Sequence, residues 1–248
     1  LSLSFRDPTS SDTSSILAFN NVVLPNLLLL QVEFDAYHRI STTSPDWRRA
    51  VPSLRRLKFG LEMPRLLDRH PHHLELDKLP IGLEELQGVY HTIPKAKEGE
   101  WPPGLTILNL LFREASVAII RSLPASLTDL RLIAGLGNPA LSNEWDFGRL
   151  TNLSSLEISV RRLSVASVLA LPRSLERFGT VGSDAIFGQN TAELLESLPR
   201  ALKWLRLNLS GLDSIQEVLA LPHTLEHIEC DVPAMTRFKN HVSIFPTL

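Results

Sequence analysis

The chain has 248 residues, of which 44% are hydrophobic and 21% charged, and its formal net charge is -2 at pH 7. A balance so close to neutral gives no general electrostatic attraction to nucleic acid or anionic membranes. No apolar run reaches the roughly 20 residues that span a bilayer; the longest leucine stretch is Leu27 to Leu30. We therefore expect neither a nucleic-acid partner nor a membrane partner.

Cys230 is the one cysteine of the chain. It excludes an internal disulfide framework and favours a reducing compartment, so we expect an intracellular, cytoplasmic protein. The sequence shows no signal peptide, but it begins at Leu1 without an initiator Met, so a targeting segment upstream stays open.

One phrase recurs along the chain: Leu-Pro, a short gap, then Leu-x-x-Leu-x-Leu, clearest over residues 123–132 and 198–207. The first leucines of successive phrases lie 22 to 29 residues apart, at Leu27, Leu54, Leu83, Leu105, Leu127, Leu153, Leu175, Leu202 and Leu225. A fixed period of roughly 20 to 29 residues is typical of leucine-rich repeats.

Each phrase predicts a short strand whose apolar side chains point inward, because they recur with the strand period of two. The pairs are Leu30/Val32, Leu57/Phe59, Leu108/Leu110, Leu130/Leu132, Leu156/Ile158, Leu205/Leu207 and Ile228/Cys230. Two repeats are degenerate, since Gly88 follows Leu86 and Thr180 follows Phe178. Residues 1–5 also alternate as a strand, with Leu3 lying 29 residues before Val32.

Between strands the apolar period changes to three and four, which predicts short helices. They cover residues 14–19, 116–123, 165–171, 192–198 and 214–221, with Ser116, Ser164, Thr191 and Asp213 as N-caps. From residue 116 onward each ends at a Leu-Pro pair, because proline disfavours helix at the residue before it. One repeat is therefore strand, loop, short helix and proline stop.

Both ends of the chain cut through this pattern. Pro246 stands where another phrase would begin, and the first strand starts at the N-terminus. We interpret residues 1–248 as a single repeat array, with about nine full repeats and partial repeats at both ends, taken from a longer chain. Natural ends that fall there by chance, or unrecognised caps, are the alternative.

Nearly the whole chain resembles a leucine-rich repeat protein of the ribonuclease-inhibitor-like superfamily, of the Leu-Pro-x-x-Leu variety. The resemblance implies an α/β fold: a right-handed horseshoe with one parallel sheet on the concave side and short helices on the convex side. A leucine-rich α/β domain with coincidental spacing is the alternative.

The family's Asn or Cys, three positions after the second strand leucine, is absent. Its places hold Asp35, Glu62, His91, Arg113, Gly135, Arg161, Ser183, Ser210 and Pro233. Without an asparagine ladder, the turn carbonyls must be satisfied individually and the curvature is expected to be irregular.

Binding in such a fold is expected on the concave sheet, at the residues that flank the inward leucines. The first column holds Leu29, Arg56, Glu85, Ile107, Asp129, Ser155, Arg177, Trp204 and His227. The second holds Gln31, Lys58, Gln87, Asn109, Arg131, Glu157, Gly179, Arg206 and Glu229. Neither column is uniform in charge, as a phosphate-tracking surface would be.

Trp204 beside Arg206 stands out in these columns, with Arg177 one repeat away and Arg131 two beyond that. Tryptophan and arginine dominate interface hot spots, because they combine large buried area with directional donors. The sequence predicts a protein-binding site of seven residues: Trp204, Arg206, Arg177, Arg131, Asp129, His227 and Glu229. In the alternative interpretation, Trp204 lies against a neighbouring strand residue and Arg206 pairs with Glu229 across the sheet.

Residues 70–73, His-Pro-His-His, with His91 downstream, invite a metal interpretation. No cysteine or paired-carboxylate signature accompanies them, so we predict no metal site and no cofactor. Cys230 occupies an inward position, where a small buried hydrophobe is expected. The sequence contains no phosphate loop, nucleophile elbow or H-E-x-x-H motif.

We therefore expect a non-catalytic module that binds a protein partner through its concave face. One alternative is the substrate-recognition part of a ubiquitin-ligase receptor with an F-box-like segment, or of an effector enzyme whose catalytic domain lies outside this sequence. Another is an extracellular recognition receptor, which the lone cysteine disfavours.

Overall fold

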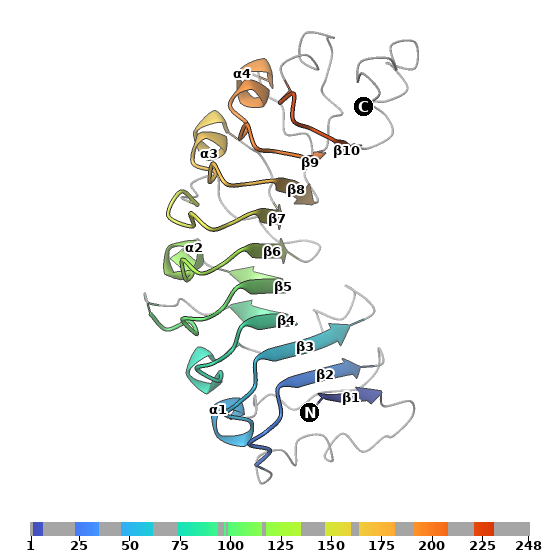
Figure 1. Ribbon diagram of the computed structural model, residues 1–248, viewed down its shortest axis with the longest axis vertical. Coiled ribbons are helices and arrows are strands. Elements are labelled where there is room, and N and C mark those ends of the chain that lie inside the picture. The colour runs from blue at the N-terminus through green and yellow to red at the C-terminus, as the bar shows by residue number, and fades with distance from the viewer. Residues whose placement is uncertain are drawn as a thin grey trace.

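A computed structural model describes residues 2–6, 23–34, 46–61, 74–93, 97, 99–115, 118–134, 147–159, 164–181, 191–207 and 221–230. They form a parallel-strand solenoid of stacked coils (Figure 1). Ten strands make one parallel sheet, and their order in the sheet is their order in the chain. The strands are β1 (Ser2–Arg6), β2 (Leu29–Phe34), β3 (Arg56–Leu61), β4 (Glu85–Ile93), β5 (Ile107–Ala115), β6 (Asp129–Ala134), β7 (Ser155–Ser159), β8 (Arg177–Val181), β9 (Trp204–Leu207) and β10 (His227–Cys230).

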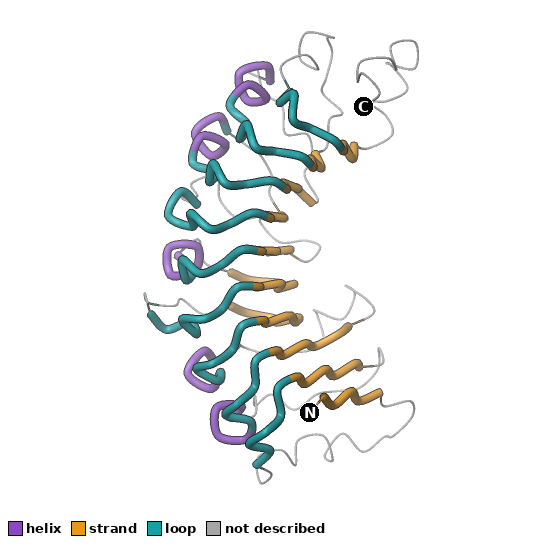
Figure 2. Tube along the Cα trace, in the orientation of Figure 1, coloured by secondary structure: helices purple, strands orange, loops and turns teal. Residues whose placement is uncertain are grey.

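Short helices lie along the side of the stack opposite the strands (Figures 1 and 2). They are α1 (Trp47–Ala50), α2 (Ala118–Ser122), α3 (Val165–Leu169) and α4 (Thr191–Glu196), with a 3₁₀ turn over Leu76–Lys78. Within the part of the chain that the structure describes, no helix is long and apolar enough to cross a bilayer.

Three of the helix predictions can be compared with the structure. Ser164 caps α3 as predicted, because its Oγ accepts a hydrogen bond of 3.1 Å from the Ser167 N–H. Thr191 is the first residue of α4 instead of its N-cap. The helix predicted over residues 116–123 is α2. The helix predicted over 14–19 lies outside the described residues, and so does the helix predicted over 214–221 apart from Leu221. The predicted N-caps Ser116 and Asp213 lie outside them as well, whereas α1 and the 3₁₀ turn had no predicted counterpart.

The Leu-Pro phrase also encodes a tight turn at the start of each strand. The Leu127 N–H donates to the Pro124 carbonyl at 3.3 Å, and the Leu225 N–H donates to the Pro222 carbonyl at 3.2 Å. The same hydrogen bond, from the N–H of one residue to the carbonyl three residues earlier, precedes every strand from β2 to β10. In eight of these nine turns a proline is the residue whose carbonyl accepts this bond or the residue after it, which restricts the backbone there. The turn before β7, from Leu150 to Leu153, contains no proline and keeps the same bond.

A repeated backbone bond holds neighbouring coils together. The Thr128 carbonyl accepts two N–H groups of the next coil, from Ser154 at 2.9 Å and from Ser155 at 3.1 Å. Equivalent carbonyls do the same throughout the stack, at Leu28, Arg55, Glu84, Thr106, Ser154, Glu176 and Lys203. Both lone pairs of each carbonyl are used, so the stacking there does not depend on the side chain.

The residue just before the first leucine adds a side-chain bond to the previous coil. Ser126 Oγ donates to the Leu105 carbonyl at 2.7 Å, and Thr224 Oγ1 donates to the Leu202 carbonyl at 2.7 Å. We call the residues that do this the turn polar row: Ser126, Asn152, Ser174 and Thr224. These turns come before the strands. The positions expected to lack the asparagine ladder come after the second strand leucine; seven of the nine lie outside the described residues, and His91 and Arg113 lie within β4 and β5, so that expectation stays a prediction.

The strand register confirms both predicted columns from β2 to β10; Arg177, Trp204 and His227, for example, are direct partners. At the N-terminal strand the sequence assignment is wrong by two residues, since Leu3 pairs with Leu30 instead of Val32. A shift of two keeps each side chain on the same face.

The core fills the space between sheet and helices with leucine. The inward leucines of β2 to β9 are fully buried wherever the phrase keeps them, for example Leu57, Leu130 and Leu205 at 0% exposure. Phe59 and Ile228 pack against this core while staying partly exposed.

The degenerate repeat of strand β4 has a packing explanation. A Cβ at Gly88 would lie 2.8 Å from the Tyr90 ring, closer than real contacts allow. Tyr90 is itself buried and fills the space that a leucine at position 88 would occupy. Burial also raises the pKa of the Tyr90 hydroxyl above its usual range.

Candidate functional site

One face of the sheet carries the side chains that alternate with the buried leucines, and we call it the open face. Strand β6 shows the alternation: Asp129 is half-buried, Leu130 and Leu132 are buried, and Arg131 is exposed. The sequence places the varied side chains on this face because the strand period is two.

All seven predicted binding residues belong to the open face, on β6, β8, β9 and β10. Six of them form a connected set in the structure. Trp204 contacts Arg177 and His227, and Arg206 contacts Glu229 directly and Arg131 through Glu157. Asp129 is the seventh, and it lies beside Ser155 instead.

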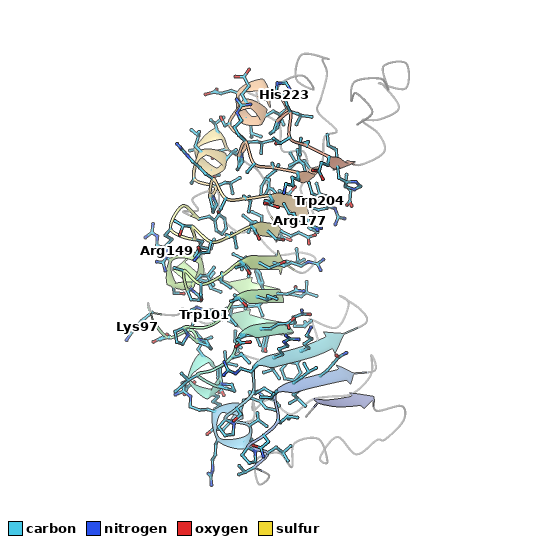
Figure 3. The ribbon with its side chains drawn as sticks, viewed as in Figure 1. Lys97, Trp101, Arg149, Arg177, Trp204 and His223 are labelled. Atoms are coloured by element: carbon cyan, nitrogen blue, oxygen red, sulfur yellow. The ribbon has the colours of Figure 1, made fainter. Side chains whose placement is uncertain are left out.

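Three planar side chains stack in register across neighbouring strands. The Arg177 guanidinium carbon lies 5.0 Å from the centre of the Trp204 ring. On β10, the His227 ring lies 6.4 Å from the Trp204 ring with an angle of 4° between planes. In Figure 3, Arg177 and Trp204 lie side by side at the strand side, away from Arg149 and Lys97. Cation–π and stacked aromatic contacts each contribute about 0.5–1.5 kcal/mol.

Gly179 makes room for this stack, and the sequence reasoning did not single it out. A Cβ there would lie 3.1 Å from the Trp204 ring and 3.4 Å from Cγ of Glu157. Gly179 lies between Glu157 and Arg206 in the second column, so its missing side chain also lets Arg206 reach a carboxylate two strands away. A glycine inside a strand is a known signal of such close approach.

Glu157 is the second residue that the prediction omitted, and it joins two predicted arginines. Its Oε2 lies 2.9 Å from Nε of Arg131, and its Oε1 lies 3.3 Å from Nη1 of Arg206. Arg206 Nε also lies 3.6 Å from Glu229, whose other oxygen lies 3.4 Å from Nε2 of His227. The result is one continuous network from β6 to β10.

The alternative interpretation of this site is confirmed in its geometry: Trp204 packs against neighbouring strand residues and Arg206 pairs with Glu229. These internal contacts leave the side chains accessible, since Arg131, Arg206 and Glu229 are each 46% exposed. Ion pairs as exposed as these contribute little to stability, about 0–1 kcal/mol each.

The pKa of Asp129, on the open face, is raised from its usual value. Burial raises its pKa, while a hydrogen bond from Ser155 and the positive charges of Arg177 and Arg131 act in the opposite direction. Burial is the largest of these causes, because desolvation disfavours the charged form.

A second charged cluster lies on β3 and β4. Glu85 is almost fully buried, and its Oε1 lies 2.8 Å from Nζ of Lys58 and 2.6 Å from the Gln87 amide nitrogen. Its other oxygen lies 3.8 Å from Nε of Arg56. The cluster compensates the buried charge internally, as a structural ion pair does.

Among the described residues, no group of three or more His, Cys, Asp or Glu side chains is arranged to hold a metal ion. Of the histidines considered above, His91 lies in β4, and residues 70–73 lie outside the described part of the chain. The register places Cys230 beside Leu207 on the neighbouring strand.

The chain matches no protein-family model and no curated protein sequence. A function is therefore argued from the solenoid and from the chemistry of its open face.

Proposed function

We propose that the chain is a leucine-rich repeat array of the ribonuclease-inhibitor-like type, curved so that the open face is concave. The supporting observations are the 22 to 29 residue phrase, the turn it forms before each strand, and the buried leucine columns. The fold alone does not define a function.

We further propose that the open face binds a protein partner, without catalysis, and that the protein acts inside the cell. The observation that carries this proposal is the stack of Arg177, Trp204 and His227 on strands β8, β9 and β10, together with the ion-pair network beside it. Arg177 and His227 are exposed, and Trp204 between them is half-buried. Arginine and tryptophan are the residues that most often supply binding energy at interfaces.

Preorganisation supports the same conclusion. The backbone of this face is fixed by the sheet, and its long side chains are held by stacking and by ion pairs. A surface ordered before binding loses less conformational entropy when the partner docks.

The experiment is quantitative co-purification from an extract of cells that express the protein, comparing wild type with Trp204→Ala/Arg206→Ala. Arg173→Ala/Arg200→Ala is the matched control, because both arginines are exposed in the turns and lie off the open face. We expect a specific protein to be recovered with wild type and control but lost with the open-face variant. Equal recovery with all three would place binding elsewhere.

A further inference from the structure

We infer that the partner docks through an acidic segment, and that Arg177 receives one of its carboxylates. This inference rests on the proposed function and adds the chemistry of the ligand. It follows from a count of hydrogen-bond donors and acceptors around the stack.

The carboxylate oxygens of the network are already engaged. Glu157 uses Oε2 for Arg131 and Oε1 for Arg206. Glu229 uses Oε2 for Arg206 and Oε1 for His227. A basic ligand would therefore compete with an existing internal contact at each of these oxygens.

The donors, in contrast, are in excess. No carboxylate of the described residues forms an ion pair with Arg177, whose guanidinium lies over the Trp204 ring and whose charge also acts on Asp129. Arg206 contributes Nε and Nη1 to its contacts, and Arg131 contributes Nε. Since each guanidinium has five N–H donors, this part of the face has donors to offer to an incoming anion.

The arrangement of charge favours a carboxylate over a polyphosphate. Asp129 interrupts the positive charge on the first column, and Glu157 and Glu229 interrupt it on the second. A nucleic-acid backbone needs a row of cations along its path, and here it would meet acids at neighbouring strands. A single carboxylate needs one guanidinium, which binds it through two parallel hydrogen bonds.

The test begins with selection of a displayed library of random twelve-residue peptides on the full chain. Peptides that bind are synthesised, and their dissociation constants are measured by fluorescence polarisation against wild type, Arg177→Gln, Arg173→Gln and Trp204→Ala/Arg206→Ala. Arg173 is the matched control, an exposed arginine in the turn that precedes the same strand.

We expect the selected peptides to be enriched in Asp and Glu, and added salt to weaken their binding. Arg177→Gln should weaken binding about tenfold or more, since a charged hydrogen-bond pair contributes that much. Arg173→Gln should leave it unchanged.

Peptides no more acidic than the library would overturn the inference. The inference would also be overturned if Arg177→Gln bound the peptides with full affinity while Trp204→Ala/Arg206→Ala no longer bound them. In that case the proposed function would stand, with a different ligand chemistry. If both variants bind fully, or if selection yields no binder, the proposed function fails as well. A single-stranded RNA is measured in the same assay. If wild type bound the RNA more tightly than the peptides, and Arg177→Gln abolished that binding, the ligand would be nucleic acid instead of an acidic segment.

Discussion

Neighbouring residues of strand β9 belong to the two faces of the sheet and follow different rules. Leu205 is buried and pairs with Phe178 on one side and Ile228 on the other, so its column repeats large apolar side chains. Trp204 and Arg206 belong to columns that mix acidic, basic and uncharged residues from strand to strand. Repetition therefore builds the scaffold, whereas departures from repetition on the open face give it chemistry.

The largest contrast is expected between Leu130 and Arg131, adjacent on β6. Leu130→Ala should lower the free energy of unfolding by about 2–5 kcal/mol, because it leaves a cavity in a fully buried column. Arg131→Ala removes one exposed ion pair and should cost less than about 1 kcal/mol. Urea unfolding followed by circular dichroism measures both, and similar losses would erase the distinction between faces.

Gly88 is an exception on the buried face, where most strands carry a leucine. Introducing leucine at this position should lower the stability of the fold. Gly88→Leu should destabilise the protein by about 1–3 kcal/mol, because the new side chain overlaps the Tyr90 ring. The double variant Gly88→Leu/Tyr90→Ala should recover part of this loss. A single Gly88→Leu variant with a raised melting temperature would show that the repeat phrase outweighs local packing.

Substitutions in the turn polar row should change stability less, and in either direction. Ser126→Ala should cost about 0.5–1.5 kcal/mol, since two carbonyls of the previous coil lose a donor. Ala201 occupies the same position in its phrase, and Ala201→Ser should gain up to a similar amount by donating to the previous turn. Thermal unfolding of both variants compares them, and opposite signs are the expected result.

The smallest effect concerns Asp129, and it depends on pH. Burial raises its folded-state pKa, so the folded protein holds this proton more tightly than the unfolded chain does. Its contribution to stability is present below the unfolded pKa and is lost as pH rises through the raised folded value. Asp129→Asn should therefore be at least as stable as wild type at neutral pH and lose that advantage in acid. Urea midpoints across a pH series would contradict this if the variant were weaker at pH 7.

The repeat phrase was sufficient to predict the sheet. Leucine spacing gave the order and register of β2 to β10, because a buried column tolerates no slip. It misplaced Leu3 by two residues, because residues 1–5 show strand alternation without the full Leu-x-x-Leu-x-Leu phrase that sets the register of the other strands. The turn polar row was hidden as well, because Ser, Thr and Asn share one role there without sharing one residue type.

The candidate site was predicted in part. The columns put Trp204, Arg206 and Arg177 on one face, which periodicity alone can do. Periodicity does not say which side chains extend to which partner, so Glu157 was missed as the residue that joins Arg131 to Arg206. Gly179 carries no side chain, and its importance appears only when Trp204 is seen to lie against it.

The most direct test of the two faces uses the three consecutive residues of β9, for which both stability and binding are measured. Leu205→Ala should lower the urea midpoint strongly. Trp204→Ala/Arg206→Ala should shift that midpoint less than Leu205→Ala does, because it removes exposed stacking and ion-pair contacts, and it should abolish binding of the peptides or protein recovered with wild type. If the double variant binds with full affinity, or if it unfolds as readily as Leu205→Ala, the division of the sheet into a structural face and a binding face is wrong.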